Sequence, residues 1–214
     1  HEDDTFVLRT MVYAKHFQFG DLLPIWSASD NFGMGSPLPG LYHRLFYMVS
    51  GAIYAVTANS KVSIALTLIA FTSIGVYSVF LLLRSFDSTV FVSLIGASVL
   101  PFLNYSVTNW LVRGAMAEYS AMMLIPLFLY VVKRSIDRSL LYGRIGLVMG
   151  FIFLAHSVIA YFTALLTGFV LIGCCLLGLS TWKMFPLKKV FYAALGFLAV
   201  TWWSLLPMLY LRQR

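Results

Sequence analysis

The sequence predicts an all-α polytopic membrane protein, and two observations carry this prediction. The 214-residue chain is 60% hydrophobic and 11% charged, with a mean hydropathy of +0.86, whereas soluble domains have about 25% charged residues. From residue 62 onward, uncharged apolar stretches of about the 20 residues that cross a bilayer alternate with short basic loops. Lipid must therefore solvate much of the chain, which divides into a first segment, 1–61, and a transmembrane bundle, 62–214.

About six transmembrane helices are expected. Four of them are placed by apolar stretches at 62–83, 88–112, 115–132 and 190–211. The remaining stretch, 145–182, would be about 57 Å long as one helix, nearly twice the hydrocarbon thickness. We therefore expect two shorter spans that meet near His156 and Ser157. Within the first of these, Gly146 and Gly150 form a GxxxG pair, which is typical of close helix packing.

Two segments have a less regular pattern. In the stretch 88–112, Pro101 and Asn104 indicate that the helix ends near residue 104 and that a polar loop follows. Residues 41–57 either cross the bilayer as a seventh span or lie in the interface as an amphipathic helix. The interfacial interpretation is used for the orientation below.

The first 40 residues differ from the rest of the chain. They hold five of the eight acidic residues together with several prolines and glycines, a composition that favours loops. A short helix is expected between Asp4 and Phe19. We predict that this segment is an ordered loop on the membrane face, with aromatic residues at the level of the headgroups.

The distribution of charge predicts the sidedness. If residues 41–57 lie in the interface, one side of the membrane receives eight basic and two acidic residues, and the other receives seven basic and six acidic. Basic loops mark the cytoplasm, so residues 1–61, the 104–118 loop and the His156 turn face the extracytoplasmic side. This topology accounts for the net charge of +7. No basic run interleaved with aromatic residues stands outside the apolar stretches, so nucleic acid is not expected as a partner.

The chain opens with the sequence His1-Glu2-Asp3-Asp4. Carboxylates beside an imidazole can hold a divalent cation, or supply a general base whose pKa is tuned by its neighbours. His1, Glu2 and Asp3 are thus candidate ligands of Mg²⁺ or Mn²⁺. The competing interpretation is an exposed acidic terminus without a role.

Arg113 and Glu118 flank the mouth of a predicted span. They can pair across a turn, or Arg113 can present its guanidinium to a phosphate group, such as that of a lipid-linked substrate. The competing interpretation is a snorkelling arginine and a glutamate that is favoured at a helix start. Both interpretations remain open at the level of the sequence.

His156 is the only Asp, Glu, Lys, Arg or His residue of its apolar run. At an outer turn it can reach the acidic loop, whereas the competing interpretation is a buried histidine bonded to a backbone carbonyl or to Ser157. For His43 and Arg44, anchoring in the membrane interface is the favoured account, with His43 kept as a candidate for substrate binding.

Four elements of the sequence together resemble a known group. After the acidic start they are Pro24-Ile25-Trp26, Asn31-Phe32-Gly33-Met34-Gly35-Ser36-Pro37, Arg113-Gly114-Ala115-Met116-Ala117-Glu118 and Ala155-His156-Ser157. They resemble the bacterial membrane proteins labelled 6-pyruvoyl-tetrahydropterin synthase-related, and more loosely the YfhO-type members of the GT-C glycosyltransferase superfamily. The resemblance covers about residues 1–165, and the RGAxxE-like element is its most specific part.

The resemblance implies a GT-C-like bundle with interfacial helices in the first extracytoplasmic loop. Such enzymes transfer a sugar from a polyprenyl-phosphate donor on the extracytoplasmic face, and an acidic residue of that loop serves as base or metal ligand. On this pattern the catalytic carboxylates are Asp3, the best match, and then Asp4. The substrate-binding residues are Arg113, Glu118, His156 and His43. Members of the group are longer, so this chain is expected to be part of a longer protein of the bacterial inner membrane.

Two functions follow as alternatives. The first is a glycosyltransferase, or a remnant of one, whose partners are membrane lipid and a polyprenyl-phosphate sugar. The second is a non-catalytic integral membrane subunit whose partners are other membrane proteins within a larger complex.

Overall fold

A computed structural model describes residues 5–28, 33–41, 43–137, 142–177 and 187–212. Apart from one isolated antiparallel bridge between Ser27 and Ser36, the regular structure of these residues is helical. The elements in chain order are α1 (Thr5–Gln18), α2 (Leu38–Leu41), α3 (Leu45–Thr57), α4 (Ser60–Arg84), α5 (Val90–Val99), η2 (Leu100–Phe102), α6 (Asn104–Val107), η3 (Thr108–Val112), α7 (Met116–Asp137), α8 (Tyr142–Ala155), α9 (Ser157–Leu176) and α10 (Leu187–Arg212). The predicted all-α class is confirmed.

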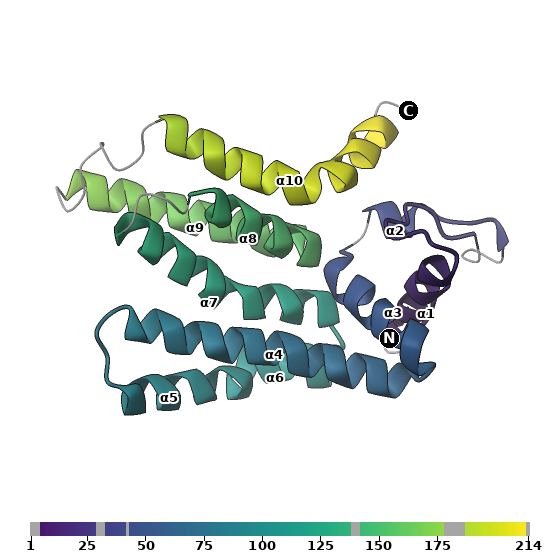
Figure 1. Ribbon diagram of the computed structural model, residues 1–214, viewed down its shortest axis with the longest axis horizontal. Helices are drawn as coiled ribbons and strands as arrows, with labels where there is room; N and C mark the ends of the chain where they lie inside the picture. The colour runs from purple at the N-terminus through teal and green to yellow at the C-terminus, as the bar shows by residue number, and fades with distance from the viewer. Residues whose placement is uncertain (1–4, 29–32, 42, 138–141, 178–186, 213–214) are drawn as a thin grey trace.

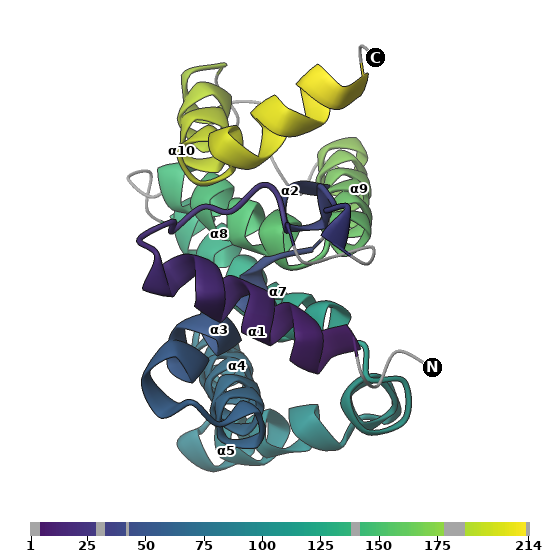
Figure 2. The ribbon, with the colours of Figure 1, turned by 90° about the vertical axis from the view of Figure 1, so that its right-hand side faces the viewer.

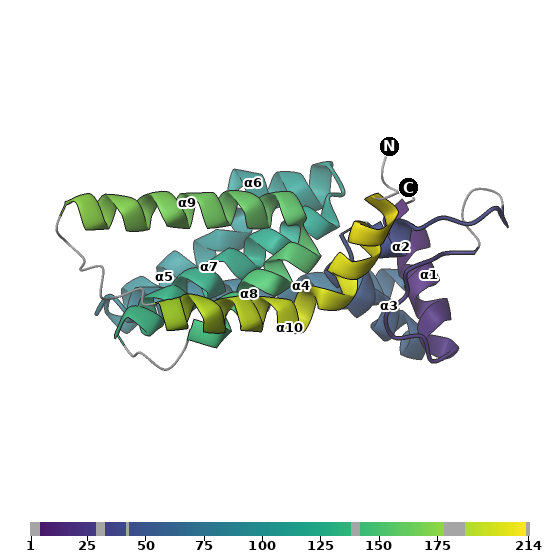
Figure 3. The same cartoon turned by 90° about the horizontal axis from the view of Figure 1, so that it is seen from above.

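The helices from α4 onward lie along the long axis of the molecule, and α1, α2 and α3 gather at one end of this bundle (Figure 1). Helices α4, α7 and α9 start at that end, and α5, α8 and α10 start at the opposite end (Figures 1 and 3). The junctions α3–α4, η3–α7 and α8–α9 therefore all lie at one end, which we call the α1 end. This is the set of turns that the charge distribution assigns to one side of the membrane.

Four helical stretches are long and apolar enough to cross a membrane. They are Ser60–Arg84, Val90–Val112, Met116–Ser135 and Lys189–Pro207. The other two predicted spans correspond to α8 and α9, whose apolar parts are shorter. At 14 residues, α8 is about 21 Å long, less than the roughly 30 Å hydrocarbon core. The four longer helices are compatible with an integral membrane protein.

The long apolar run is divided at the predicted residue. Helix α8 ends at Ala155 and α9 begins at Ser157, and both helices run from His156 toward the opposite end of the bundle (Figure 3). The last carbonyls of a helix lack partners within it, and here the backbone N–H of Arg44 donates to the carbonyl of Leu154 at 2.9 Å. A chain segment far away in sequence thus completes the end of α8.

The predicted polar loop after Asn104 is wrong. Pro101 does interrupt the span, as expected of a residue without an N–H. Beyond it, however, α6 and the π-helical η3 continue in helical form to Val112. Asn109 is fully buried in η3, and its carbonyl accepts the N–H of Ala115 at 2.8 Å. Ser106 and Asn109 are therefore buried within a helical segment, whereas Asn104 and Tyr105 are exposed on it.

The predicted helix between Asp4 and Phe19 is confirmed as α1. Figure 2 shows α1 lying across the end of the bundle, above α3 and α4. It packs closely on α3, because a Cβ atom on Gly51 would lie 2.6 Å from Cβ of Tyr13, and the buried hydroxyls of Thr10 and Ser50 are 2.9 Å apart. The ambiguous segment 41–57 contains α2's last residue and the 13-residue α3, which at about 20 Å is too short to cross the hydrocarbon core.

The close packing predicted for Gly146 and Gly150 is present between α8 and α10. A Cβ atom on Gly146 would lie 2.7 Å from the carbonyl carbon of Ala193, and one on Gly150 would lie 3.3 Å from the carbonyl oxygen of Phe197. From the other side, a Cβ atom on Gly196 would lie 2.9 Å from the carbonyl carbon of Gly143. Backbone approaches of this kind are the means by which helices associate in lipid.

Candidate functional site

Four residues that the sequence singles out come together at the α1 end of the bundle. His43 precedes α3, Arg113 follows η3, Glu118 lies in the first turn of α7, and His156 joins α8 to α9. His43 and His156 are in ring contact, and Glu118 is close enough to act electrostatically on both. We call these four side chains the end cluster.

Arg113 and Glu118 pair across the η3–α7 turn. The two guanidinium nitrogens Nη2 and Nη1 lie 3.2 Å and 3.3 Å from Oε2 and Oε1 of the carboxylate, respectively. The Arg113 side chain is 52% exposed and the Glu118 side chain 15% exposed, so the pair sits at the surface with its carboxylate turned inward. The sequence left open whether Arg113 pairs with Glu118 or presents its guanidinium to a phosphate, and in the structure it pairs with Glu118 across the turn.

Two residues that the sequence did not single out support this pair. The hydroxyl of Tyr105 donates to Oε1 of Glu118, and Oδ1 of Asn109 accepts a hydrogen bond from Nη1 of Arg113 at 2.9 Å. The spacing of Asn109 and Arg113, four residues along a helix, places them on one face and is a signal that could have revealed the contact. The long-range contact of Tyr105 had no such signal.

The two histidines stack and also complete the start of α9. Their ring centroids are 3.8 Å apart. Nδ1 of His43 accepts the backbone N–H of Ser157 at 3.3 Å, and Nδ1 of His156 accepts that of Ile159 at 3.4 Å. The first N–H groups of a helix lack partners within it, so both rings act as caps. The predicted alternative in which His156 bonds a backbone carbonyl or the Ser157 side chain is replaced by this N–H contact.

Both rings are biased toward the neutral form. The pKa of His43 is lowered to about 4, first because burial desolvates the imidazolium, and further because His156 and Arg9 lie nearby, while Glu118 opposes the shift. The pKa of His156 is also lowered by burial, with Glu118 again opposing. In a neutral ring whose Nδ1 accepts a hydrogen bond, Nε2 carries the proton. The end cluster thus contains two neutral N–H donors.

Arg9 is a further charged residue of this region that the sequence did not single out. It comes from α1, and its guanidinium carbon lies 5.5 Å from the centroid of the Tyr47 ring. Its charge contributes to the lowered pKa of His43. The site therefore draws guanidinium groups from two separate elements, α1 and the η3–α7 turn.

Arg44, the neighbour of His43, is not an interfacial anchor, and that prediction is wrong. It is 1% exposed, its side chain donates to the carbonyl of Gly40, and its guanidinium lies 4.4 Å from the centroid of the Trp203 ring. Stacking on an indole offsets part of the cost of burying a cation. Arg44 joins α10 to the segment before α3 and so holds His43 in place.

The predicted catalytic and metal-binding residues His1, Glu2, Asp3 and Asp4 lie outside the described residues, which begin at Thr5. Within the described residues, no group of three or more His, Cys, Asp or Glu side chains could hold a metal ion. The roles predicted for the acidic start, and for Mg²⁺ or Mn²⁺, stay predictions.

Comparisons of the chain with protein-family models, with curated proteins and with solved structures found no match. Function is therefore inferred from the chemistry of the site. The end cluster and Arg9 together present two guanidinium groups, one carboxylate and two neutral imidazoles. Such a set suits an anionic ligand rich in oxygen acceptors, such as a phosphate ester.

Proposed function

We propose that this chain is a GT-C-like membrane glycosyltransferase, or a remnant of one, that transfers a sugar from a polyprenyl-phosphate donor on the extracytoplasmic face of the bacterial inner membrane. The observation that carries the proposal is the end cluster. Its residues come from three separate parts of the chain, which are the segment before α3, the η3–α7 turn and the α8–α9 joint, and meet beside Arg9 at the α1 end of an apolar helical bundle. A lipid-linked substrate needs such a polar site at the end of apolar helices.

The proposed reaction begins with a general base. Asp3, with Asp4 as second choice, accepts the proton of the acceptor hydroxyl, whose oxygen forms the bond to the anomeric carbon. The bond from that carbon to the phosphate oxygen breaks, and polyprenyl phosphate leaves with the electron pair. Donors that meet the charge developing on the leaving phosphate speed such a step.

The proposed donors are Arg113 and the Nε2–H groups of His43 and His156. Glu118 already pairs with Arg113. In this proposal the carboxylate orients the guanidinium and offsets part of its positive charge, so that the phosphate product is not held too tightly to leave. A divalent cation at His1, Glu2 and Asp3 would add charge stabilisation beside the phosphate. Sugar transfer should then stop on chelation and return when Mg²⁺ or Mn²⁺ is added.

The direct test is sugar transfer from a polyprenyl-phosphate sugar by the purified protein in lipid vesicles. We expect Asp3→Asn to reduce turnover by at least about a hundredfold, the usual contribution of a general base. Asp87→Asn is the matched control, because Asp87 lies in the α4–α5 turn at the opposite end of the bundle, where its φ of 60° suits asparagine equally well. Equal turnover of wild type and Asp3→Asn would remove Asp3 from this role.

The alternative, a non-catalytic membrane subunit, is favoured by one observation on α9. The large apolar side chains of Phe162, Leu166 and Phe169, which share one face at helical spacing, are exposed, and Gly168 faces open space. Substitution Gly168→Trp separates the two functions. A subunit that docks through α9 should lose its complex in a mild detergent, whereas an enzyme of the proposed kind should keep its turnover.

A further inference from the structure

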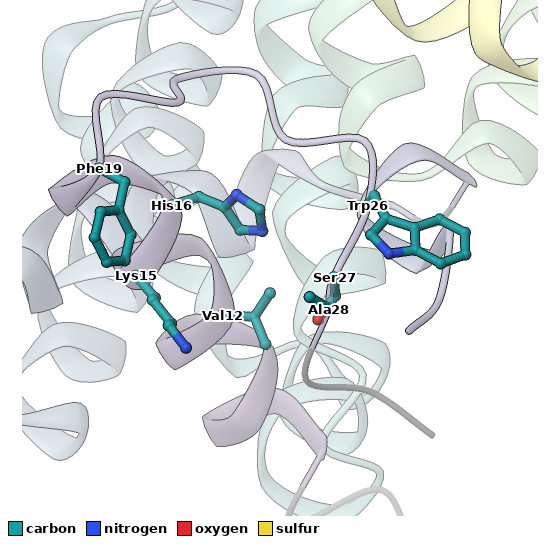
Figure 4. Close-up of a pocket in the computed structure, with 7 residues that line it drawn as sticks. All are labelled: Val12, Lys15, His16, Phe19, Trp26, Ser27 and Ala28. Atoms are coloured by element: carbon teal, nitrogen blue, oxygen red, sulfur yellow. The ribbon is translucent and has the colours of Figure 1, made fainter. Parts of the chain in front are cut away.

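A pocket of about 280 Å³ lies at the α1 end, away from the end cluster. Helix α1 supplies Val12, Lys15 and His16 on one side, where Phe19 follows the helix, and Trp26, Ser27 and Ala28 lie on the other (Figure 4). Two contacts join the second side of the pocket to residues 35 and 36. The backbones of Ser27 and Ser36 exchange two hydrogen bonds of 2.8 Å, and the Trp26 indole packs against Gly35, where a Cβ atom would lie 2.6 Å from the ring.

Lys15 places an ammonium group at this pocket. The carboxylate of Asp21 is engaged by His16 at 2.9 Å, and its other oxygen accepts the N–H of Leu23 at 3.3 Å. Lys15, which is exposed, has no carboxylate partner within the described part of the chain. An ammonium group therefore stands at the edge of a pocket whose wall is formed mainly by apolar atoms of Phe19, Trp26 and Val12.

The surface around the pocket is apolar well beyond what scattered exposed residues explain. Phe19 is 81% exposed and Leu22 is 66% exposed. The neighbouring large apolar side chains that are also exposed are Leu23, Ile25 and Trp26. In a water-facing surface such a continuous run marks an interaction site.

We infer that this pocket binds an anionic phospholipid of the bilayer surface, with the lipid phosphate on Lys15 and the start of an acyl chain on Phe19 and Trp26. The chemistry of the site combines one cation with aromatic and aliphatic groups, which is the composition that membrane interfaces select. The placement agrees, because α1 lies across the end of a bundle of apolar helices (Figure 2), where the headgroups would be. The acidic charge of the phosphate complements Lys15.

The test is photocrosslinking in vesicles of phosphatidylcholine and phosphatidylglycerol. The full chain carries the photoreactive residue benzoylphenylalanine in place of Phe19. We expect covalent adducts with phosphatidylglycerol to exceed its share of the bilayer by about fivefold, which corresponds to the roughly 1 kcal/mol that one lysine contributes near an anionic surface. Lys15→Gln should reduce the adducts to the bulk ratio. Lys61→Gln is the matched control, because Lys61 is an exposed lysine of the same end, in the first turn of α4, and should leave the preference unchanged.

Three outcomes would overturn the inference. Adducts at the bulk ratio in the wild-type background would exclude a headgroup site, and adducts with a protein chain would show that a second copy occupies the surface. Absence of lipid adducts would place the residue outside the bilayer, provided that benzoylphenylalanine at Phe169, exposed on α9, reacts with lipid in the same vesicles.

Discussion

The imidazole rings of His43 and His156 lie stacked, with their centroids 3.8 Å apart and their planes inclined by 26°. Each ring uses Nδ1 to accept a backbone N–H from the first turn of α9. The contact therefore joins the segment before α3 to the α8–α9 joint, and it requires both rings to be unprotonated at Nδ1. Charge on either ring would remove a cap and place a cation against its neighbour.

This requirement predicts a loss of stability in acid. The pKa of His43 is about 4 in the folded protein and about 6.5 in an unfolded chain. Between these values the unfolded state binds a proton that the folded state does not, so the free energy of unfolding falls as pH falls from about 6.5 to about 4. Thermal unfolding of the detergent-solubilised protein across this range measures the slope.

The matched comparison for the acid effect uses two histidines. His43→Gln should flatten the decline, whereas His16→Gln should retain it, because His16 lies on α1 and pairs with Asp21. An unchanged slope in His43→Gln would show that the stacked pair is not its source.

Removing the charge of Glu118 should lower the pKa of His156 further. The carboxylate raises that pKa while Arg113 lowers it, so Glu118→Gln removes the stabilising neighbour of the imidazolium and Arg113→Gln should act in the opposite direction. Carbon NMR of ring-labelled histidine, with the signal assigned through His156→Asn, gives both titrations. Asp21→Asn is the control and should leave the His156 signal unmoved; opposite shifts to those stated would contradict the arrangement of the end cluster.

Arg44 and Trp203 should be energetically coupled. The guanidinium lies over the indole at 4.4 Å in a buried setting, where such contacts contribute up to about 2 kcal/mol. Trp203→Leu should therefore destabilise the wild type more than it destabilises an Arg44→Met variant, with a coupling of about 1–2 kcal/mol in a double-mutant cycle. The neighbouring Trp202 is exposed, and Trp202→Leu should give a coupling near zero in the same denaturation assay.

The α8–α10 contact should not tolerate a side chain at Gly146. Gly146→Ala would place a methyl group against the carbonyl group of Ala193, 2.7 Å from its carbon atom, and neither helix backbone can yield cheaply, so we expect destabilisation of about 1–3 kcal/mol. Gly168 has no atom within 4 Å of a built Cβ, so Gly168→Ala should be neutral or stabilising by up to about 1 kcal/mol. Equal unfolding midpoints for the two variants would argue against the packing of α8 on α10.

The sequence by itself determined what depends on local composition. Continuous apolar stretches of about 20 residues predict helices, because a helix satisfies its backbone polar groups within the segment. The length of the 145–182 stretch predicted a break, and its only histidine, His156, marked the position. The spacing of Gly146 and Gly150 likewise indicated a close helix contact, because glycine has no side chain to keep two helix backbones apart.

Only the tertiary structure decided which distant groups meet. Arg44 is of the residue type that anchors proteins in the membrane interface, but it is buried, because Trp203 of α10 packs over its guanidinium. The stretch 104–112 has the polarity of a loop but is helical, and its Tyr105 reaches Glu118 on α7. The stacking of His43 on His156 and the approach of Arg9 depend on how α1 and α3 close the end of the bundle. Such contacts arise from packing between remote segments, which no local pattern encodes.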